Sequence, residues 1–382
     1  MMTNSIIIRY SEIFIKSENV FRIYERKLLG NIAKHLNKSK IEAKIKTERG
    51  RIFLFTEKIE ECLKILNNIF GIQSFSPAIY LSTTNKEDLA KFISKYYETL
   101  IPEGKTFAIR VNKGIDADYK SKELEAYLGS FVKRKVNLEN PDIEINFDIR
   151  KIGTFVYTTN IKGLGGLPIS ASGKVISLIS GGIDSAVSSY FAMKRGCEVV
   201  YLHFSSFPIA SKKSIEKVEK LIEVLNKFQV KSKLYIANIG EYQLKMKSVA
   251  NPKYLVVLYR RLMFRVAEKI AEMENAKALV TGESVGQVSS QTLHNLKLIE
   301  EVVKIPILRP LIGFNKDEII EIAKKIGTYK ISIIPCEDTC SMFVGRHSSA
   351  AANENKVKEY EKTLGINKMV KKILKEIEIK DI

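Results

Sequence analysis

The spacing of apolar and polar residues changes several times along the first 75 residues, and each spacing predicts a different element. Residues 5–16 alternate and are rich in β-branched side chains, which predicts a strand. Residues 20–36 place apolar groups at helical spacing, and two short strands are predicted on either side of a turn at 48–51. A second amphipathic helix is predicted to end at Gly71.

This order of strand, helix, two strands and helix predicts a small ferredoxin-like α+β unit over residues 1–75. A second α+β unit is predicted over residues 76–165, with helices at 86–100 and 121–135 and strands beside them. The second helix would carry the basic run 133–135 in its last turn, where the helix dipole favours positive charge. Basic residues recur at the ends of elements in both units, which fits a face that follows a phosphate backbone.

Beyond a linker rich in Gly, Ser and Pro at 162–173, the pattern changes to alternating strands and helices. Continuous apolar runs such as residues 174–180 are typical of parallel strands that are buried on both faces. Residues 166–382 are therefore predicted to form a doubly wound α/β domain with a parallel sheet. Ligands of such domains bind at the carboxyl ends of the strands.

The composition of the chain indicates the kind of partner it binds and the compartment in which it works. The chain has 382 residues, a formal net charge of +19 and a pI near 9.5, which favours a polyanionic partner such as nucleic acid or an anionic membrane. No apolar run reaches the roughly 18 residues of a membrane span, and the N-terminus lacks the order of a signal peptide. Four cysteines are too few for a disulfide scaffold, so we expect a cytoplasmic protein that does not act at a membrane.

The sequence Ser180-Gly181-Gly182-Ile183-Asp184-Ser185 joins a predicted strand to a predicted helix. Glycines let the backbone approach a ligand, and the free N–H groups of a helix N-terminus attract anions such as phosphate. The turn does not match a Walker loop. Asp184 would repel a bare phosphate, so it is expected to act through a metal ion or as a helix cap.

The sequence SGGIDS resembles the PP-loop of the ATP pyrophosphatase superfamily. Further stretches, among them YTTNIKGLGGLP, TGESVGQVSSQTL, ILRPLIGFNKDEI and IIPCEDTCSMF, resemble the tRNA 4-thiouridine synthase family in the right order along nearly the whole chain. The resemblance implies a ferredoxin-like domain and a THUMP domain that bind tRNA, at 1–75 and 76–165, and a PP-loop domain at 166–382. It also implies that the PP-loop domain uses ATP and Mg²⁺ to adenylate the uridine at position 8. A sulfur atom then replaces O4 of that uridine.

Carried over by motif, the resemblance assigns site residues. Asp184 is expected to take part in catalysis, and Arg260 to bind phosphate with its planar guanidinium while Arg261 faces solvent. Glu283 and Ser284 are expected beside the metal or the phosphates. The ATP-binding residues would be Leu178, Ile179, Ser180, Gly181, Gly182, Ser185, His203, Phe204, Arg260, Gly282 and Gln291.

Sulfur chemistry is assigned to Cys340, which aligns with a reactive cysteine of the family, and to Cys336, which stands where other members carry an aromatic residue. Nearby Arg346 and His347 would favour a thiolate, and a reversible Cys336–Cys340 disulfide is conceivable. Free cysteines are also often small buried hydrophobic groups. An iron–sulfur cluster would need Cys197 as a third ligand and departs from the spacing of members that hold one, so it is the less favoured alternative.

The resemblance implies a cysteine desulfurase or sulfide as sulfur donor, and a homodimer is one expectation because members are often dimers. The sequence ends at Ile382 without room for a rhodanese domain, so we expect a short-form enzyme without the thiamine-related role of that domain. Two other functions stay open. A PP-loop ligase acting on a small molecule would not show tRNA-stimulated ATP cleavage, and a non-catalytic tRNA-binding protein would form no 4-thiouridine. A PP-loop ligase acting on another RNA base is a variant of the first alternative.

Overall fold

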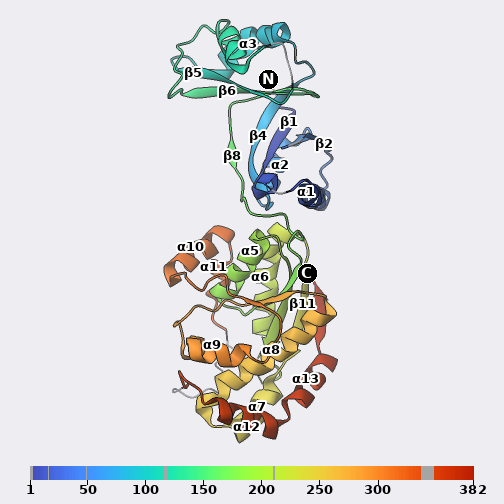
Figure 1. The fold of residues 1–382 in the computed structure, drawn as a ribbon, viewed down its shortest axis with the longest axis vertical. Coiled ribbons are helices and arrows are strands. Elements are labelled where there is room, and N and C mark those ends of the chain that lie inside the picture. Colours follow the sequence, from blue (N-terminus) through green and yellow to red (C-terminus); the bar gives the residue numbers. More distant parts are fainter. Residues whose placement is uncertain (1–2, 16, 49, 116–118, 210, 337–347) are drawn as a thin grey trace. The chain divides into compact units, whose positions relative to one another are not determined.

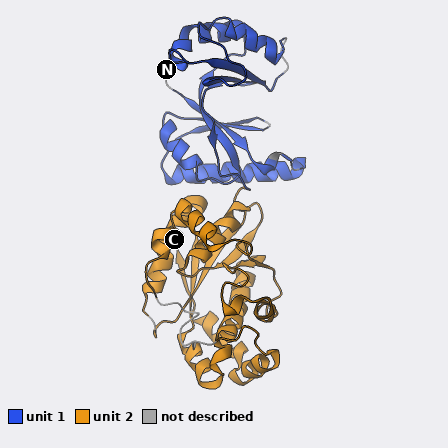
Figure 2. Cartoon of the chain, turned by 90° about the vertical axis from the view of Figure 1, so that its left-hand side faces the viewer, with its two compact units in different colours: residues 1–167 blue, residues 168–382 orange. Residues whose placement is uncertain are grey.

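The computed structural model describes the chain except for residues 1–2, 16, 49, 116–118, 210 and 337–347. It divides into two units, residues 1–167 and residues 168–382 (Figures 1 and 2). Among the described residues, no helix has the length and apolar character needed to cross a membrane.

A single sheet runs through unit 1, because one long strand belongs to both of its halves. Strand β4 (Ile72–Leu81) pairs with β1 through residues 72–78 and with β7 through residues 79–81. The strand order is β2 (Lys44–Glu48), β3 (Arg51–Phe55), β1 (Ser5–Tyr10), β4, β7 (Gly153–Tyr157), β6 (Ile143–Arg150) and β5 (Phe107–Lys113), with β8 (Ile161–Lys162) also on β4. The helices are α1 (Glu18–Lys38), α2 (Ile59–Leu66), α3 (Lys86–Leu100) and α4 (Ser121–Gly129).

The two halves of unit 1 are also joined on the sheet face opposite their helices. The rings of Phe53 on β3 and Phe155 on β7 stack with centroids 4.2 Å apart, although β1 and β4 lie between their strands. Arg51 Nε donates to the fully buried Asp148 carboxylate at 3.2 Å, which links β3 to β6. The sheet is therefore strongly bent, and the contacts on its inner side hold both halves together.

Three expectations for unit 1 are wrong in detail. The helix predicted to end at Gly71 ends at Leu66. The strand predicted at 5–16 ends at Tyr10 and is followed by a 3-10 helix at Glu12–Ile15. Helix α4 ends at Gly129, so residues 133–135 lie beyond it and do not complement its dipole. The amide groups of Phe131 and Val132 bond back to the carbonyl groups of Leu128 and Gly129, which closes a turn directly after the helix.

Unit 2 is a three-layer α/β/α domain, which confirms the predicted doubly wound fold. Its strand order is β13 (Ile307–Leu308), β12 (Ala278–Val280), β9 (Lys174–Leu178), β10 (Glu198–Ser205), β11 (Lys233–Asn238) and β14 (Glu378–Asp381), and only β14 is antiparallel. Helices α5 (Ile183–Lys194), α6 (Lys213–Gln229), α10 (Lys316–Ile326) and α11 (Tyr329–Ser332) pack together in one layer. The other layer holds α7 (Gly240–Val249), α8 (Leu255–Met273), α9 (Leu293–Glu300), α12 (Glu354–Leu364) and α13 (Ile366–Lys375).

The strand order of unit 2 reverses beside β9. The chain passes from β9 outward to β10 and β11, and then returns to add β12 and β13 on the other side. Such a switch point leaves a crevice at the carboxyl ends of the strands, because the connecting helices run to opposite faces. The turn 180–185 follows β9 directly and therefore lies at this crevice. The division into three domains with boundaries at 75 and 165 stays a prediction.

Glu274, which caps the end of α8, anchors that helix to the sheet. Its carboxylate accepts hydrogen bonds from Lys174 on β9 at 2.8 Å, and from Lys233 and the Tyr235 hydroxyl on β11 at 2.6 Å each. Burial alone would raise the pKa of Glu274, but these three donors more than offset it and lower the pKa to about 2.

Candidate active site

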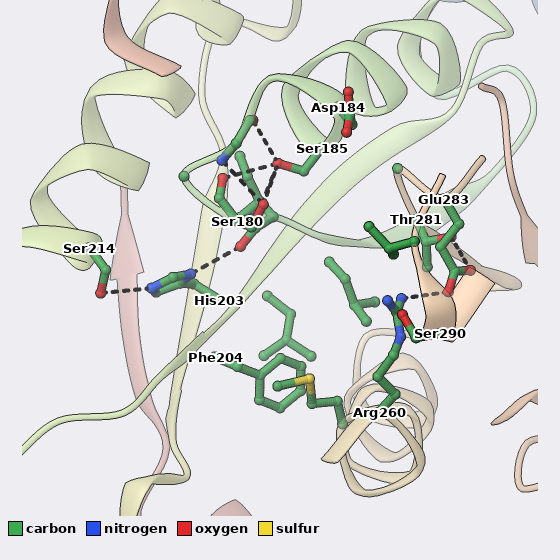
Figure 3. A pocket seen from close by; sticks show the side chains of 18 of the residues that line it. Ser180, Asp184, Ser185, His203, Phe204, Ser214, Arg260, Thr281, Glu283 and Ser290 are labelled. Atoms are coloured by element: carbon green, nitrogen blue, oxygen red, sulfur yellow. Dashed lines mark hydrogen bonds and ion pairs between the residues drawn. The ribbon is translucent and has the colours of Figure 1, made fainter. Parts of the chain in front are cut away.

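A cavity of about 450 Å³ opens at the carboxyl ends of β9, β10 and β12, within the size range of small-ligand sites (Figure 3). It brings together all eleven residues predicted to bind ATP, together with Asp184 and Cys336. Sequence reasoning did not identify the remaining lining residues apart from Glu283, namely Leu202, Ser214, Lys217, Met263, Phe264, Thr281, Gln287, Val288 and Ser290.

The turn between β9 and α5 is held by its own hydroxyl groups. Ser185 Oγ accepts a hydrogen bond from the Ser180 amide at 3.1 Å and lies 3.0 Å from the Ser180 carbonyl oxygen and 3.2 Å from that of Gly182. Ser180 Oγ in turn accepts from the Gly182 amide at 3.2 Å. Because Ser185 is buried, these bonds fix the turn before any ligand arrives (Figure 3).

Gly282, in the loop after β12, lies so close to the first turn of α5 that a side chain would not fit. A Cβ atom on Gly282 would lie 2.7 Å from the Asp184 carbonyl carbon and 2.9 Å from the Ser185 amide nitrogen. Backbone atoms cannot yield as a flexible side chain can, so any larger residue would push the β12 loop away from the first turn of α5. Gly282 thus brings two walls of the cavity together.

Asp184 lies in the first turn of α5, where the structure shows an ion pair and no side-chain cap. Its Oδ1 atom accepts from Lys316 Nζ at 2.6 Å, and Oδ2 accepts from Gln287 Nε2 at 3.2 Å. Lys316 begins α10, 132 residues further along the chain, and its role was missed because no local sequence signal connects it to the turn. The carboxylate therefore occupies a position that attracts a cation, and its expected action through a metal ion stays a prediction.

His203 connects the end of β10 to the turn. Its Nδ1 atom lies 3.0 Å from the Ile179 carbonyl oxygen, and its Nε2 atom lies 3.3 Å from the Ser214 hydroxyl. Since a carbonyl only accepts, a neutral ring donates from Nδ1 and accepts at Nε2. His203 is 3% exposed and thus also has a structural part in holding the strand ends, while Phe204 beside it offers an apolar ring to the cavity (Figure 3).

Arg260 is held at the cavity by Glu283. Its Nη2 atom donates to Glu283 Oε1 at 2.5 Å, and Oε2 accepts from Thr281 Oγ1 and Arg309 Nε at 2.9 Å each. Burial alone would raise the pKa of Glu283, but Arg260, Arg309 and the Thr281 hydroxyl outweigh it and hold the pKa below its usual value. Glu283 therefore stays ionised and keeps the Arg260 guanidinium in place for an anion.

The expectation that Arg261 faces solvent is wrong. Its side chain is 2% exposed and donates to Glu361 at 2.8 and 2.9 Å and to Glu301 at 2.6 Å. A buried guanidinium needs such carboxylate partners. These carboxylates come from α12 and the end of α9, so Arg261 joins helices of the second layer, away from the cavity.

Cys336 is partly exposed and lines the cavity, whereas Cys340, Arg346 and His347 lie outside the described residues. The proposed third cluster ligand lies far away. Cys197 is buried at the amino end of β10, about 20 Å along that strand from His203 at the cavity. Among the described residues, no group of three or more His, Cys, Asp or Glu side chains is arranged to hold a metal ion.

Comparison with known proteins matches every part of this architecture. Residues 170–366 match the family model described as thiamine biosynthesis protein (ThiI), residues 5–76 match the ThiI ferredoxin-like domain, and residues 83–159 match the THUMP domain. The probable tRNA sulfurtransferase of Methanothermobacter thermautotrophicus is 40% identical over 381 residues, covering 97% of this chain and 96% of the relative. That of Moorella thermoacetica is 38% identical over 386 residues, covering 99% and 97%.

A solved structure agrees over the full length. The crystal structure of a 4-thiouridine synthetase–RNA complex with bound ATP is 34% identical to this chain and covers 100% of both chains with a TM-score of 0.90. The predicted resemblance is thereby confirmed. The chain belongs to the ThiI family, whose tRNA sulfurtransferases it resembles along its whole length.

Proposed function

We propose that this protein is an ATP-dependent tRNA sulfurtransferase that converts the uridine at position 8 of tRNA to 4-thiouridine. The observation that carries the proposal is the cavity itself, where a preorganised SGGIDS turn, an arginine and a cysteine meet at the switch point of the sheet. The family membership and the similar ATP-bound 4-thiouridine synthetase support the same activity.

ATP would lie across the cavity with its phosphates on the SGGIDS turn. The turn leads into the N-terminus of α5, where the helix dipole favours negative charge. Arg260, held by Glu283, would pair with a phosphate oxygen, and the adenine would lie near the apolar side chain of Phe204.

Asp184 is a suitable ligand for a Mg²⁺ ion, because Mg²⁺ prefers carboxylate oxygens. Its Oδ1 atom already pairs with a positive charge, the ammonium group of Lys316. When bound, the ion would neutralise charge on the phosphate oxygens. The chain's own contribution is then to orient the nucleotide and to keep competing water away from the α-phosphorus.

The reaction proceeds in two displacements. The uridine O4 attacks the α-phosphorus, the bond to the β-phosphate breaks, and pyrophosphate leaves. A sulfur nucleophile then attacks C4 of the adenylated base, and AMP departs with the original O4. Because the base lies within folded RNA, it must leave its stack to reach the cavity.

With a cysteine desulfurase as donor, sulfur would reach the base as a persulfide on Cys340, and Cys336 would release the thiolated base by forming a Cys336–Cys340 disulfide that an external thiol then reduces. With sulfide as donor, the sulfide would attack C4 directly. Cys336 supports this route because it lines the same cavity as the SGGIDS turn. The net charge of +19 suits a tRNA partner.

Thiolation of a tRNA transcript by the purified protein tests the proposal. With ATP and either sulfide or a desulfurase plus cysteine, we expect 4-thiouridine at position 8, measured by nucleoside mass spectrometry. Comparison of the two donors identifies the source of sulfur. ATP cleavage that tRNA does not stimulate, with no thiolated product from either donor, would instead favour a ligase for a small molecule.

A further inference from the structure

Lys217 is a buried lysine at the cavity to which the reaction above assigns no role. It lies on α6 with 9% of its surface exposed. Its Nζ atom donates to the carbonyl oxygens of Ser332 at 2.8 Å and Ile334 at 2.7 Å. Among the described residues, no carboxylate forms an ion pair with it, so its charge is balanced chiefly by these two backbone dipoles.

The same side chain packs against the SGGIDS turn. A Cβ atom on Gly181 would lie 2.9 Å from Lys217 Cδ, 3.3 Å from Cε and 3.4 Å from Nζ. The absence of a side chain at residue 181 therefore leaves the space through which the lysine reaches the two carbonyl groups. Lys217 touches the nucleotide-binding turn at one side and the segment 332–334 at the other.

That segment leads directly to Cys336. The amides of Ile333 and Ile334 bond back to α11, but their side chains are 53% and 49% exposed and give the segment little apolar packing. Charged donors form stronger hydrogen bonds than neutral ones. The two bonds from Lys217 are thus a principal anchor of the backbone that precedes Cys336. Burial lowers the pKa of Lys217, and proximity to Cys336 acts in the opposite direction.

We propose that Lys217 is a positioning residue that ties segment 332–334 to the SGGIDS turn and thereby holds the Cys336 thiol at the nucleotide cavity. The activation of the base by ATP and the delivery of sulfur must occur at one C4 atom. Because the Lys217 side chain contacts both segments, it would fix the position of the Cys336 thiol relative to the nucleotide on the SGGIDS turn. The inference deepens the proposed function and rests on it for its catalytic consequence.

The test compares Lys217→Met with Lys220→Met, an exposed lysine on the same helix. Alkylation of Cys336 by iodoacetamide is followed by peptide mass spectrometry, with and without a non-hydrolysable ATP analogue. In the wild type and in Lys220→Met, the analogue should protect Cys336. In Lys217→Met, this protection should be lost, and the kcat for thiolation should fall about 10- to 100-fold with little change in the KM for ATP.

Lys217→Arg, which keeps the cation and its donors, should restore part of the protection and of the kcat, and it serves if the methionine variant fails to fold. Wild-type protection and thiolation in Lys217→Met would overturn the inference. A lost affinity for ATP with unchanged kcat would also overturn it, because Lys217 would then be a phosphate ligand. A wild-type protein that shows protection but no thiolation would refute the proposed function and leave the positioning role standing.

Discussion

Removal of the Ser185 hydroxyl is predicted to weaken ATP binding about 30-fold. The hydroxyl has one proton, so it donates to only one of its two carbonyl neighbours while accepting from the amide and hydroxyl of Ser180. Three such bonds at about 1 kcal/mol each give about 3 kcal/mol, of which water at the partly exposed turn recovers about 1 kcal/mol. The remaining 2 kcal/mol corresponds to a factor of about 30 in the dissociation constant.

Isothermal titration of ATP into Ser185→Ala measures this loss, and Ser188→Ala is the matched control. Ser188 is also buried on the same helix, but its hydroxyl donates within the helix, to the Ser185 carbonyl oxygen at 3.0 Å. The control should bind ATP as the wild type does, and both variants should bind tRNA normally. Equal ATP affinity in the two variants would refute the idea that the Ser185 hydroxyl preorganises the turn.

Three further predictions concern charge. Asp184→Ala should abolish ATP-dependent thiolation while tRNA binding in a gel-shift assay stays normal; unchanged thiolation would contradict its assignment. Glu283→Gln leaves the partly buried Arg260 without its carboxylate and Arg309 with Glu300 alone, and should lower the free energy of unfolding by about 3 kcal/mol in urea titrations, whereas a change below about 1 kcal/mol would show that the cluster contributes little. Because the pKa of Glu274 is lowered to about 2, its stabilisation is present above pH 4.5 and is lost as the pH falls toward 2, so Glu274→Gln should flatten the acid limb of thermal stability against pH.

Local signals account for the parts of the fold that the sequence predicted. Helix α3 covers the predicted residues 86–100, because Asn85 caps its first turn by accepting from the amides of Glu87 and Asp88. The SGGIDS turn is likewise local, since its glycines and hydroxyls interact within six residues. A signal of this kind can be read without knowledge of the rest of the chain.

Contacts between distant segments account for what the sequence missed. Asp184 and Lys316 are 132 residues apart, and Lys217 meets the carbonyl oxygen of Ser332 from 115 residues away. Arg261 was misjudged for the same reason, because its partner Glu361 lies 100 residues further on. Strand β14 has only four residues, and most of them are exposed. Its sequence therefore shows no strand periodicity, and only its pairing with β11 in the structure identifies it.

The stoichiometry of the reaction tests the central claim most directly. In a single-turnover reaction with α-³²P-labelled ATP, a tRNA transcript and a sulfur donor, AMP and 4-thiouridine are quantified in the same sample. The account predicts one AMP released for each 4-thiouridine formed, with pyrophosphate as the other product. Formation of 4-thiouridine without AMP, or with ADP and phosphate as the products, would contradict activation of the tRNA base by adenylation at the SGGIDS turn.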